Sequence, residues 1–159
     1  MSKLSKFFLC VTLCELVGLA ATPITMNAIT TWYATLEKPA FTPPNWVFGP
    51  VWTIMYFLMG VALYYVWTKK IKSKKITKKK AYLYFSLQLL FNFLWSVIFF
   101  GLHSPLFALL DIVILLIFIT LTIKAFFTIS QQAGALMLPY LLWVMFATML
   151  NGAIVLLNP

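Results

Sequence analysis

The sequence predicts an all-α integral membrane protein, built as a bundle of five transmembrane helices. Of its 159 residues, 63% are hydrophobic and only 9% are charged, and the mean hydropathy is +0.96. Soluble domains carry about 25% charged residues, so this chain cannot cover a surface that faces water. Apolar runs near the length needed to cross ~30 Å of hydrocarbon recur along it. We expect these runs to form a single transmembrane domain over residues 1–159.

Five helices are expected in order, and prolines, glycines and polar turns mark their ends. The first apolar run begins like a secretory signal peptide, but it extends to about Ile29 and Glu15 interrupts its core. We therefore expect a retained spanning helix there. Pro43 and Pro44 precede the second helix, with Asn45 as its expected N-cap. The expected helices cover about 7–29, 46–67, 81–100, 105–127 and 133–157.

The placement of the lysines predicts how the bundle is oriented. With five spans, Lys3, Lys6, the lysine-rich segment 69–80 and Lys124 share one side of the membrane, and Lys38 lies on the other. The positive-inside rule then places the N-terminus in the cytoplasm and the first inter-helix loop outside, in a multi-pass protein of the cell membrane. The lysine-rich segment is expected to form a solvated hairpin that attracts anionic headgroups of membrane lipids. No recognition motif accompanies the charge, so no nucleic acid partner is expected.

The connection between the first two helices is unusually aromatic and stiff. Residues 32–56 read WYATLEKPAFTPPNWVFGPVWTIMY, a run that combines many aromatic rings with several prolines. A plain connector would not need so many rigid side chains, whereas a site for a small apolar molecule is usually lined with aromatic residues. We therefore expect this segment to form the lid and rim of a binding pocket.

Three of the expected helices carry polar and aromatic side chains along one face. At helical spacing these faces comprise Gln88, Asn92, Trp95 and Phe99 in the third helix, Tyr140, Trp143, Ala147 and Asn151 in the fifth, and Trp52 and Tyr56 in the second. Amide groups that faced lipid would cost several kcal/mol each, so the faces are expected to point inward. Two interpretations stay open. The faces either hold helices together through hydrogen bonds of about 0.6–2 kcal/mol, or line a cavity for a small molecule.

Few residues suggest conventional chemistry. Glu15 and Asp111 are acidic residues inside the spans, and each is either a functional group or a neutral, hydrogen-bonded carboxyl. Asp111 is the favoured polar contact for a ligand because it lies towards the same end as the aromatic loop. His103 suits a wet interfacial turn better than an axial haem ligand, and Cys10 and Cys14 suit helix packing better than metal binding. Hydrolase, phosphate-loop and zinc motifs are absent from the sequence, so neither a metal site nor a certain catalytic residue is assigned.

Ordered motifs along nearly the whole chain resemble the TspO family, also called translocator protein or peripheral-type benzodiazepine receptor. They are WY at 32–33, LEKPAFTPP at 36–44, WVFGPVWTIMY at 46–56, QLLFNFLWS at 88–96 with FF at 99–100, and PYLLWVMFATMLN at 139–151. The resemblance implies a five-helix bundle, usually homodimeric, with a ligand pocket beneath the first loop.

The resemblance also implies a tetrapyrrole ligand, such as protoporphyrin IX or a haem-related porphyrin, and no tightly bound cofactor. Family members bind benzodiazepine-site ligands as well. Some promote light- and oxygen-dependent porphyrin breakdown, for which Trp52 and Trp143 are the candidate residues here. Carried over by motif, the ligand contacts are Tyr33, Pro43, Trp52, Asn92, Trp95, Trp143 and Ala147, and the face of the third helix adds Phe99.

The expected role is sensing or regulation, and the alternative is a transporter of porphyrins or other lipophilic molecules, including sterol-like ones. The sequence has no inverted repeat and no paired broken helices of the kind seen in many transporters. Animal members are credited with a cholesterol pattern at the end of the fifth helix, a Tyr followed by a basic residue. The sequence ATMLNGAIVLLNP at 147–159 has neither, which argues against a sterol as the main ligand.

Overall fold

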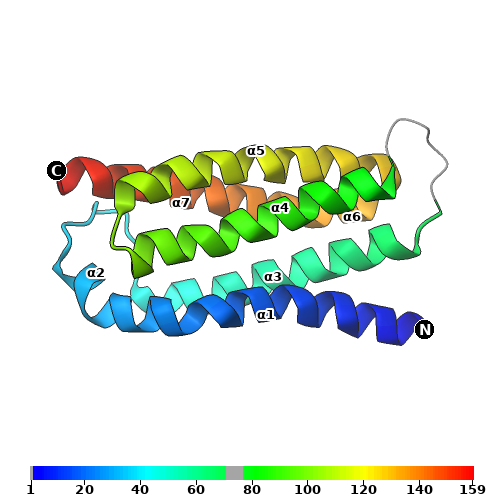
Figure 1. Cartoon of the computed structure of the whole chain (residues 1–159), viewed down its shortest axis with the longest axis horizontal. Helices are drawn as coiled ribbons and strands as arrows, with labels where there is room; N and C mark the ends of the chain where they lie inside the picture. Colours follow the sequence, from blue (N-terminus) through cyan, green and yellow to red (C-terminus); the bar gives the residue numbers. More distant parts are fainter. Residues whose placement is uncertain (1, 71–76) are drawn as a thin grey trace.

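The fold is a bundle of five membrane-length helices, as the sequence predicts. The computed structural model describes residues 2–70 and 77–159, and these residues are helical with short connections and no strand (Figure 1). The helices are α1 (Lys3–Thr30), α2 (Trp32–Thr35), α3 (Asn45–Thr68), α4 (Lys78–Ser96), the π-helix η1 (Val97–Gly101), α5 (Pro105–Ile129), α6 (Gln131–Leu136) and α7 (Leu138–Leu157). The five spans are α1 with α2, α3, α4 with η1, α5, and α6 with α7.

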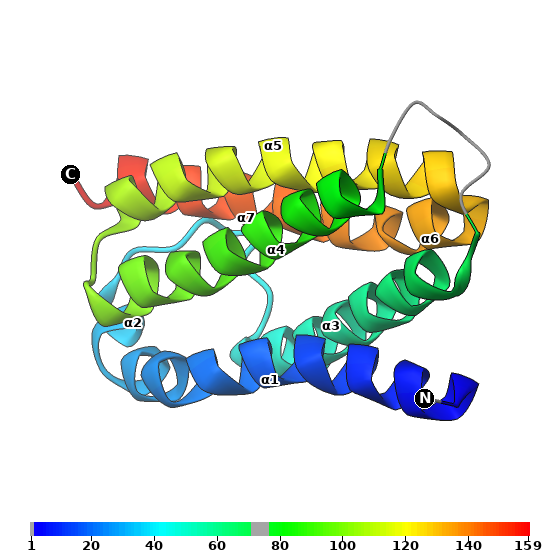
Figure 2. The ribbon, with the colours of Figure 1, turned by 45° about the vertical axis from the view of Figure 1, so that its right-hand side comes forward.

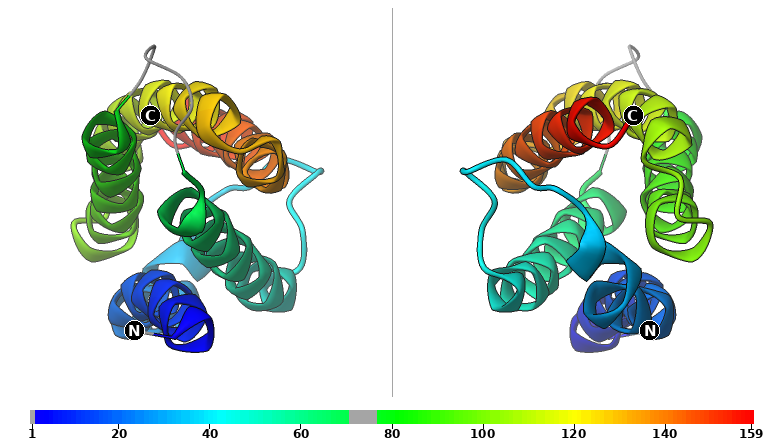
Figure 3. Two further views of the ribbon diagram at one scale, coloured as in Figure 1. Left: turned by 90° about the vertical axis from the view of Figure 1, so that its right-hand side faces the viewer. Right: turned by 90° about the vertical axis from the view of Figure 1, so that its left-hand side faces the viewer.

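The helices form a closed ring when the bundle is viewed along its length (Figure 3). Helix α1 packs against α3, α3 against α6 and α7, α7 against α5, and α5 against α4. Helices α4 and η1 close the ring by contacting α1. In this order the second, third and fifth spans face one another across the interior, where side chains of α3 and α7 bond to a side chain of α4. The polar and aromatic faces of those spans therefore meet inside the bundle.

Local chemistry explains where several helices begin and break. Helix α4 begins three residues earlier than the predicted start at 81, because the Thr77 hydroxyl accepts a hydrogen bond from the N–H of Lys80 at 3.3 Å and caps the helix. Helix α1 begins early for the same reason, with Ser2 as its N-cap. The last span is divided into α6 and α7 at Met137, two residues before Pro139, which has no N–H to continue the helical ladder.

The two ends of the bundle differ in charge. The N-terminus lies at one end, whereas α2 and the C-terminus lie at the other (Figure 1). Lys3, Lys6, Lys69 and Lys78 lie at the N-terminal end, and Lys38 follows α2 at the opposite end. The solvated hairpin expected over 69–80 lies partly outside the described residues, at 71–76. The charge difference supports a fixed orientation, and the direction of that orientation stays a prediction.

Helices α1 and α3 touch most closely near the N-terminal end. A Cβ atom placed on Gly60 of α3 would lie 2.5 Å from the Cα of Val11 and 3.0 Å from the backbone oxygen of Cys10. Backbone therefore meets backbone, and only glycine fits. Cys10 and Cys14 are buried free thiols that pack on this side of α1, in agreement with the packing role expected for them.

We predict that Gly60→Ala lowers the free energy of unfolding by about 1–3 kcal/mol, because the added methyl group has to push two backbones apart. Thermal unfolding in detergent would measure the change. The matched control is Gly152→Ala in α7, where the new methyl group would meet only a Leu109 side-chain atom at 3.9 Å. That control should be neutral or slightly stabilising, and equal losses in the two variants would contradict the close-approach explanation.

Candidate functional site

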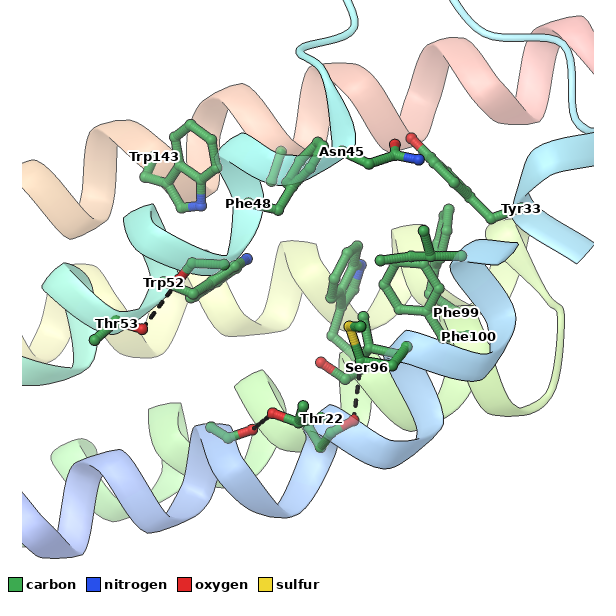
Figure 4. Close-up of a pocket in the computed structure, with 18 of the residues that line it drawn as sticks. Thr22, Tyr33, Asn45, Phe48, Trp52, Thr53, Ser96, Phe99, Phe100 and Trp143 are labelled. Carbon is green, nitrogen blue, oxygen red and sulfur yellow. Dashed lines mark hydrogen bonds between the residues drawn. The ribbon is translucent and has the colours of Figure 1, made fainter. Parts of the chain in front are cut away.

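A cavity of about 550 Å³ lies inside the half of the bundle nearest α2. Its walls come from α1, α2, α3, α4 with η1, and α7. Figure 4 shows Trp143, Phe48 and Trp52 on one side of the cavity, with Ser96, Phe99 and Phe100 across from them. The aromatic residues of the lining are Tyr33, Trp46, Phe48, Trp52, Tyr56, Trp95, Phe99, Phe100 and Trp143. The site is therefore apolar and aromatic, with a few polar groups, as is usual for a small-molecule pocket.

The structure brings most of the predicted contact residues to this cavity. The ones that line it are Tyr33, Trp52, Trp95, Phe99, Trp143 and Ala147. Pro43, Asn92 and Asp111 are not among the lining residues. Pro43 is half-buried in the loop before α3, whereas Asn92 and Asp111 are buried within the helix bundle.

Aromatic contacts fix the cavity walls before any ligand is present. The Trp95 and Phe99 rings stack at a centroid distance of 5.1 Å, and Tyr33 lies 6.1 Å from the Phe99 ring. On the other side, Phe48 meets the edge of Trp143 at 6.0 Å. Such aromatic pairs contribute about 0.5–1.5 kcal/mol each beyond burial alone. The walls are thus pre-organised and offer ring surfaces to a flat ligand.

Asn92 holds three helices together beneath the cavity. Its side-chain oxygen accepts a hydrogen bond from the Tyr56 hydroxyl of α3, and its nitrogen donates to the Tyr140 hydroxyl of α7 at 2.9 Å. Tyr56 also lines the cavity, so this network forms its floor. The expectation that Asn92 bonds directly to a ligand does not fit this geometry, because the amide is buried and engaged by both phenols. The alternative left open by the sequence, interhelical hydrogen bonding, describes Asn92 better.

A second network occupies the indole N–H of Trp95, whereas the indole N–H of Trp143 has no partner among the described residues. The Trp95 indole N–H donates to the Asn151 oxygen at 3.1 Å, and the Asn151 nitrogen donates to the backbone oxygen of Pro105 at 2.8 Å. Trp95 therefore presents its ring, and not its N–H, to the cavity. The Trp143 indole nitrogen is buried and has no hydrogen-bond partner within the described chain. An acceptor group on a ligand would satisfy it.

The two acidic residues of the spans differ in their position relative to the cavity. Glu15 of α1 lines the cavity, whereas Asp111 of α5 does not. Asp111 is only 6% exposed, and its Oδ2 atom lacks a partner among the described residues. Asp111 therefore faces inward as expected but away from the cavity lining, and which carboxyl meets a ligand stays a prediction. Position along the bundle does not show which side of each helix faces the cavity.

Helix α1 contributes a wall that the sequence reasoning missed. Its lining residues follow helical spacing and are Glu15, Gly18, Leu19, Ala21, Thr22, Thr25, Met26 and Ile29. Glu15, Thr22 and Ile29 recur every seven residues, a period that could have revealed the face. Apart from Glu15, Thr22 and Thr25, these side chains are small or aliphatic, so most of this face resembles one that contacts lipid.

The loop between α2 and α3 is fastened over the cavity end of the bundle. It runs along α7 before it turns back to α3 (Figure 2). The Asn158 side chain forms two hydrogen bonds with the backbone of Glu37. The Glu37 N–H donates to the Asn158 side-chain oxygen at 3.0 Å, and the Asn158 side-chain nitrogen donates to the Glu37 backbone oxygen at 3.0 Å. Phe41 meets Phe146 of α7 at 6.3 Å. These contacts make the aromatic loop a lid anchored to α7.

His103 reinforces the same end of the bundle and takes no part in the cavity. Its ring stacks on Trp32 of α2 at 4.6 Å, and its φ angle of 53° places the turn before α5 in the left-handed region. It does not line the cavity, so the haem-ligand alternative has no geometric support. No group of three or more His, Cys, Asp or Glu residues within 2–70 and 77–159 is arranged to hold a metal ion.

Comparison with known proteins points to one family. The profile of the TspO/MBR family matches residues 10–157. The "Tryptophan-rich protein TspO" of Archaeoglobus fulgidus is 48% identical over 142 residues, covering 89% of this chain and 90% of the relative. The protein of the same name from Chlorobaculum tepidum is 45% identical over 151 residues, covering 95% and 94%. The "Tryptophan-rich sensory protein" of Cereibacter sphaeroides is 38% identical over 127 residues, covering 80% and 77%.

We predict that Asn92→Ala lowers the free energy of unfolding by about 1–3 kcal/mol, because it leaves two buried phenol groups without their partner. Thermal unfolding in detergent would measure the loss. Asn45→Ala is the control, since Asn45 is an exposed amide at the cavity rim. If Asn92→Ala unfolded at the same temperature as this control, the three-helix network would not stabilise the bundle.

We predict that Asn158→Ala loosens the lid without unfolding the bundle, because it removes both hydrogen bonds to Glu37. Amide hydrogen exchange over residues 36–44 should become several-fold faster, and exchange within α4 and α5 should not change. Asn27→Ala, at an exposed amide of α1, should leave the lid unaffected. A slow-exchanging lid in the Asn158 variant would show that other contacts hold it.

Proposed function

This chain belongs to the TspO/MBR family, and we propose that it binds a tetrapyrrole such as protoporphyrin IX or a haem-related porphyrin in the membrane. The observation that carries the proposal is the aromatic cavity of about 550 Å³, together with the Trp143 indole N–H that has no partner among the described residues. The volume lies within the range of about 300–1,000 Å³ typical of small-molecule sites. The cavity takes the porphyrin as a ligand, and a tightly held cofactor is not part of the proposal.

A planar, largely apolar macrocycle suits the walls of this site. The flat faces of Trp52 and Trp95 offer stacking surfaces, and the Trp143 N–H offers a donor for a polar edge. Lys38 adds a positive charge on the lid side, where its Nζ lies 4.9 Å from the centroid of the Tyr33 ring. A porphyrin with carboxylate side chains would place these groups towards Lys38 and its apolar ring between the indoles.

A sensing or regulatory role follows best from the closed lower end of the cavity. The Tyr56–Asn92–Tyr140 network fills the bundle beneath the ligand, so the cavity does not continue as a pore. The name of the Cereibacter sphaeroides relative, a sensory protein, supports the same reading. Transport of porphyrins or other lipophiles is the second candidate, favoured by the exposed Leu19, Met26 and Trp46 on the cavity walls.

Light- and oxygen-dependent porphyrin breakdown is included in the proposal as a secondary activity. An illuminated porphyrin in this cavity would produce reactive oxygen beside Trp52 and Trp143, and the chemistry would belong chiefly to the ligand. The same apolar cavity would accept benzodiazepine-site ligands. We further propose that the chain forms a homodimer in the membrane, with lipids around it.

We predict that Trp143→Phe weakens protoporphyrin binding about two- to tenfold, the effect of losing one buried hydrogen bond. Trp52→Leu should weaken it by a similar or larger factor, because a stacking surface is lost. Equilibrium titration of protoporphyrin IX in detergent, followed by the porphyrin absorbance, would measure both. Loss of absorbance under light, recorded on the same samples, would test the breakdown activity.

Trp67→Phe is the matched control, because Trp67 lies outside the cavity at the opposite end of α3. It should bind porphyrin like the unaltered protein. Unchanged affinity in both cavity variants would refute the proposed site, and equal photobleaching in every variant would refute protein-assisted breakdown. Protein-dependent porphyrin flux in proteoliposomes would favour transport over sensing.

A further inference from the structure

A second hollow lies at the lysine-rich end of the bundle, away from the aromatic cavity. It has a volume of about 310 Å³ and is formed by α1, α3 and α4. Its lining residues are Leu9, Cys10, Leu13, Leu63, Trp67 and Tyr82, none of which belongs to the cavity beneath the lid. The groove is therefore an independent feature of the molecule.

The groove is an apolar channel that opens to the outside of the bundle. Leu9 and Leu13 lie one turn apart on α1, with exposed fractions of 49% and 50%. Leu63 and Trp67 also lie one turn apart on α3, where Leu63 is buried and Trp67 is half-buried. In a membrane protein such exposed leucines face lipid. Each pair of residues four apart spans about 6 Å of helix, enough to follow several methylene groups of an acyl chain.

Two lysine ammonium groups converge at the end of this groove. Lys6 of α1 places its Nζ 5.4 Å from the centroid of the Trp67 ring. Lys78 of α4 donates from its Nζ to the backbone oxygen of Trp67 at 2.7 Å. Trp67 of the groove is therefore contacted by ammonium groups from two different helices. Trp and Lys commonly occupy this level of a membrane protein, where hydrocarbon gives way to headgroups.

The chain itself provides no counter-charge for these two lysines. It has only three acidic residues, Glu15, Glu37 and Asp111. Glu15 follows Lys6 by nine residues on α1, a rise of about 14 Å, and it lines the aromatic cavity. Glu37 and Asp111 lie at or near the opposite end of the bundle. The pair is therefore open to an anion from outside the chain.

We propose that this groove binds an anionic phospholipid, with one acyl chain along Leu9, Leu13 and Leu63 and the phosphate between Lys6 and Lys78. The charge complementarity selects an anionic headgroup, and the adjoining apolar channel selects a lipid over a free phosphate ion. Basic pockets between transmembrane helices hold lipid headgroups in this way. The site is independent of the porphyrin proposal, because the two share no residue.

The test compares two double variants of the full chain that remove the same charge. Lys6→Gln with Lys78→Gln removes the convergent pair, whereas Lys3→Gln with Lys79→Gln removes two exposed lysines from the first turns of the same helices. Each protein is purified from nanodiscs of phosphatidylcholine containing phosphatidylglycerol, and retained lipid is measured by native mass spectrometry. In the Lys6→Gln, Lys78→Gln variant, the ratio of retained phosphatidylglycerol to retained phosphatidylcholine should fall about tenfold. In the Lys3→Gln, Lys79→Gln control, this ratio should not change.

A variant of the groove itself distinguishes a lipid-binding site from general attraction of anionic lipid to the lysines. Leu9→Trp fills the channel from an exposed position and leaves every lysine in place, so it should also reduce phosphatidylglycerol retention. Protoporphyrin binding and the elution volume in gel filtration serve as folding controls and should not change. Equal loss in the two lysine variants, or full retention by folded Leu9→Trp, would overturn the proposal.

Discussion

The buried amide of Asn92 is the constraint on which the rest of the bundle depends. In hydrocarbon no water can satisfy a polar side chain, so an asparagine within a span has to find protein partners. It finds them in the phenols of Tyr56 and Tyr140, which come from two other spans. Because each bond has a defined direction, the network fixes the rotation of α3, α4 and α7 about their own axes. Apolar packing alone would allow those helices to slip.

This fixed rotation explains why the aromatic cavity lies on one side of the network and the close approach of α1 and α3 on the other. Above the network, the rings of Trp52, Trp95 and Trp143 all face inward, and large rings at one level keep the helices apart. Below it, smaller residues allow α1 and α3 to meet at Gly60. The hydrogen-bonded layer therefore separates the aromatic cavity from the part of the bundle where α1 and α3 meet backbone to backbone.

The sequence was sufficient for the spans and for the inward faces of three helices, because both follow from composition and helical period. It was not sufficient to decide which inward residues meet a ligand and which meet another helix. Asn92 and Trp95 share one face of α4, yet Asn92 bonds to two phenols while the Trp95 ring lines the cavity. That division depends on the register between helices. Period alone cannot supply it, and for the same reason it could not place Glu15 at the cavity and Asp111 away from it.

The lid over the cavity and the side wall of the cavity, between α1 and α3, have different contacts. The lid is closed by directional bonds between Asn158 and Glu37, so opening it requires breaking polar contacts at the aqueous end. The side wall contains Leu19, Met26 and Trp46, which are exposed on the surface that faces lipid and also line the cavity. A lipophilic ligand is concentrated in the bilayer and not in water, so the wall between α1 and α3 is its shorter route. The anchored lid then serves to hold the rim aromatics in position, while the side wall is the part of the cavity lining that meets lipid.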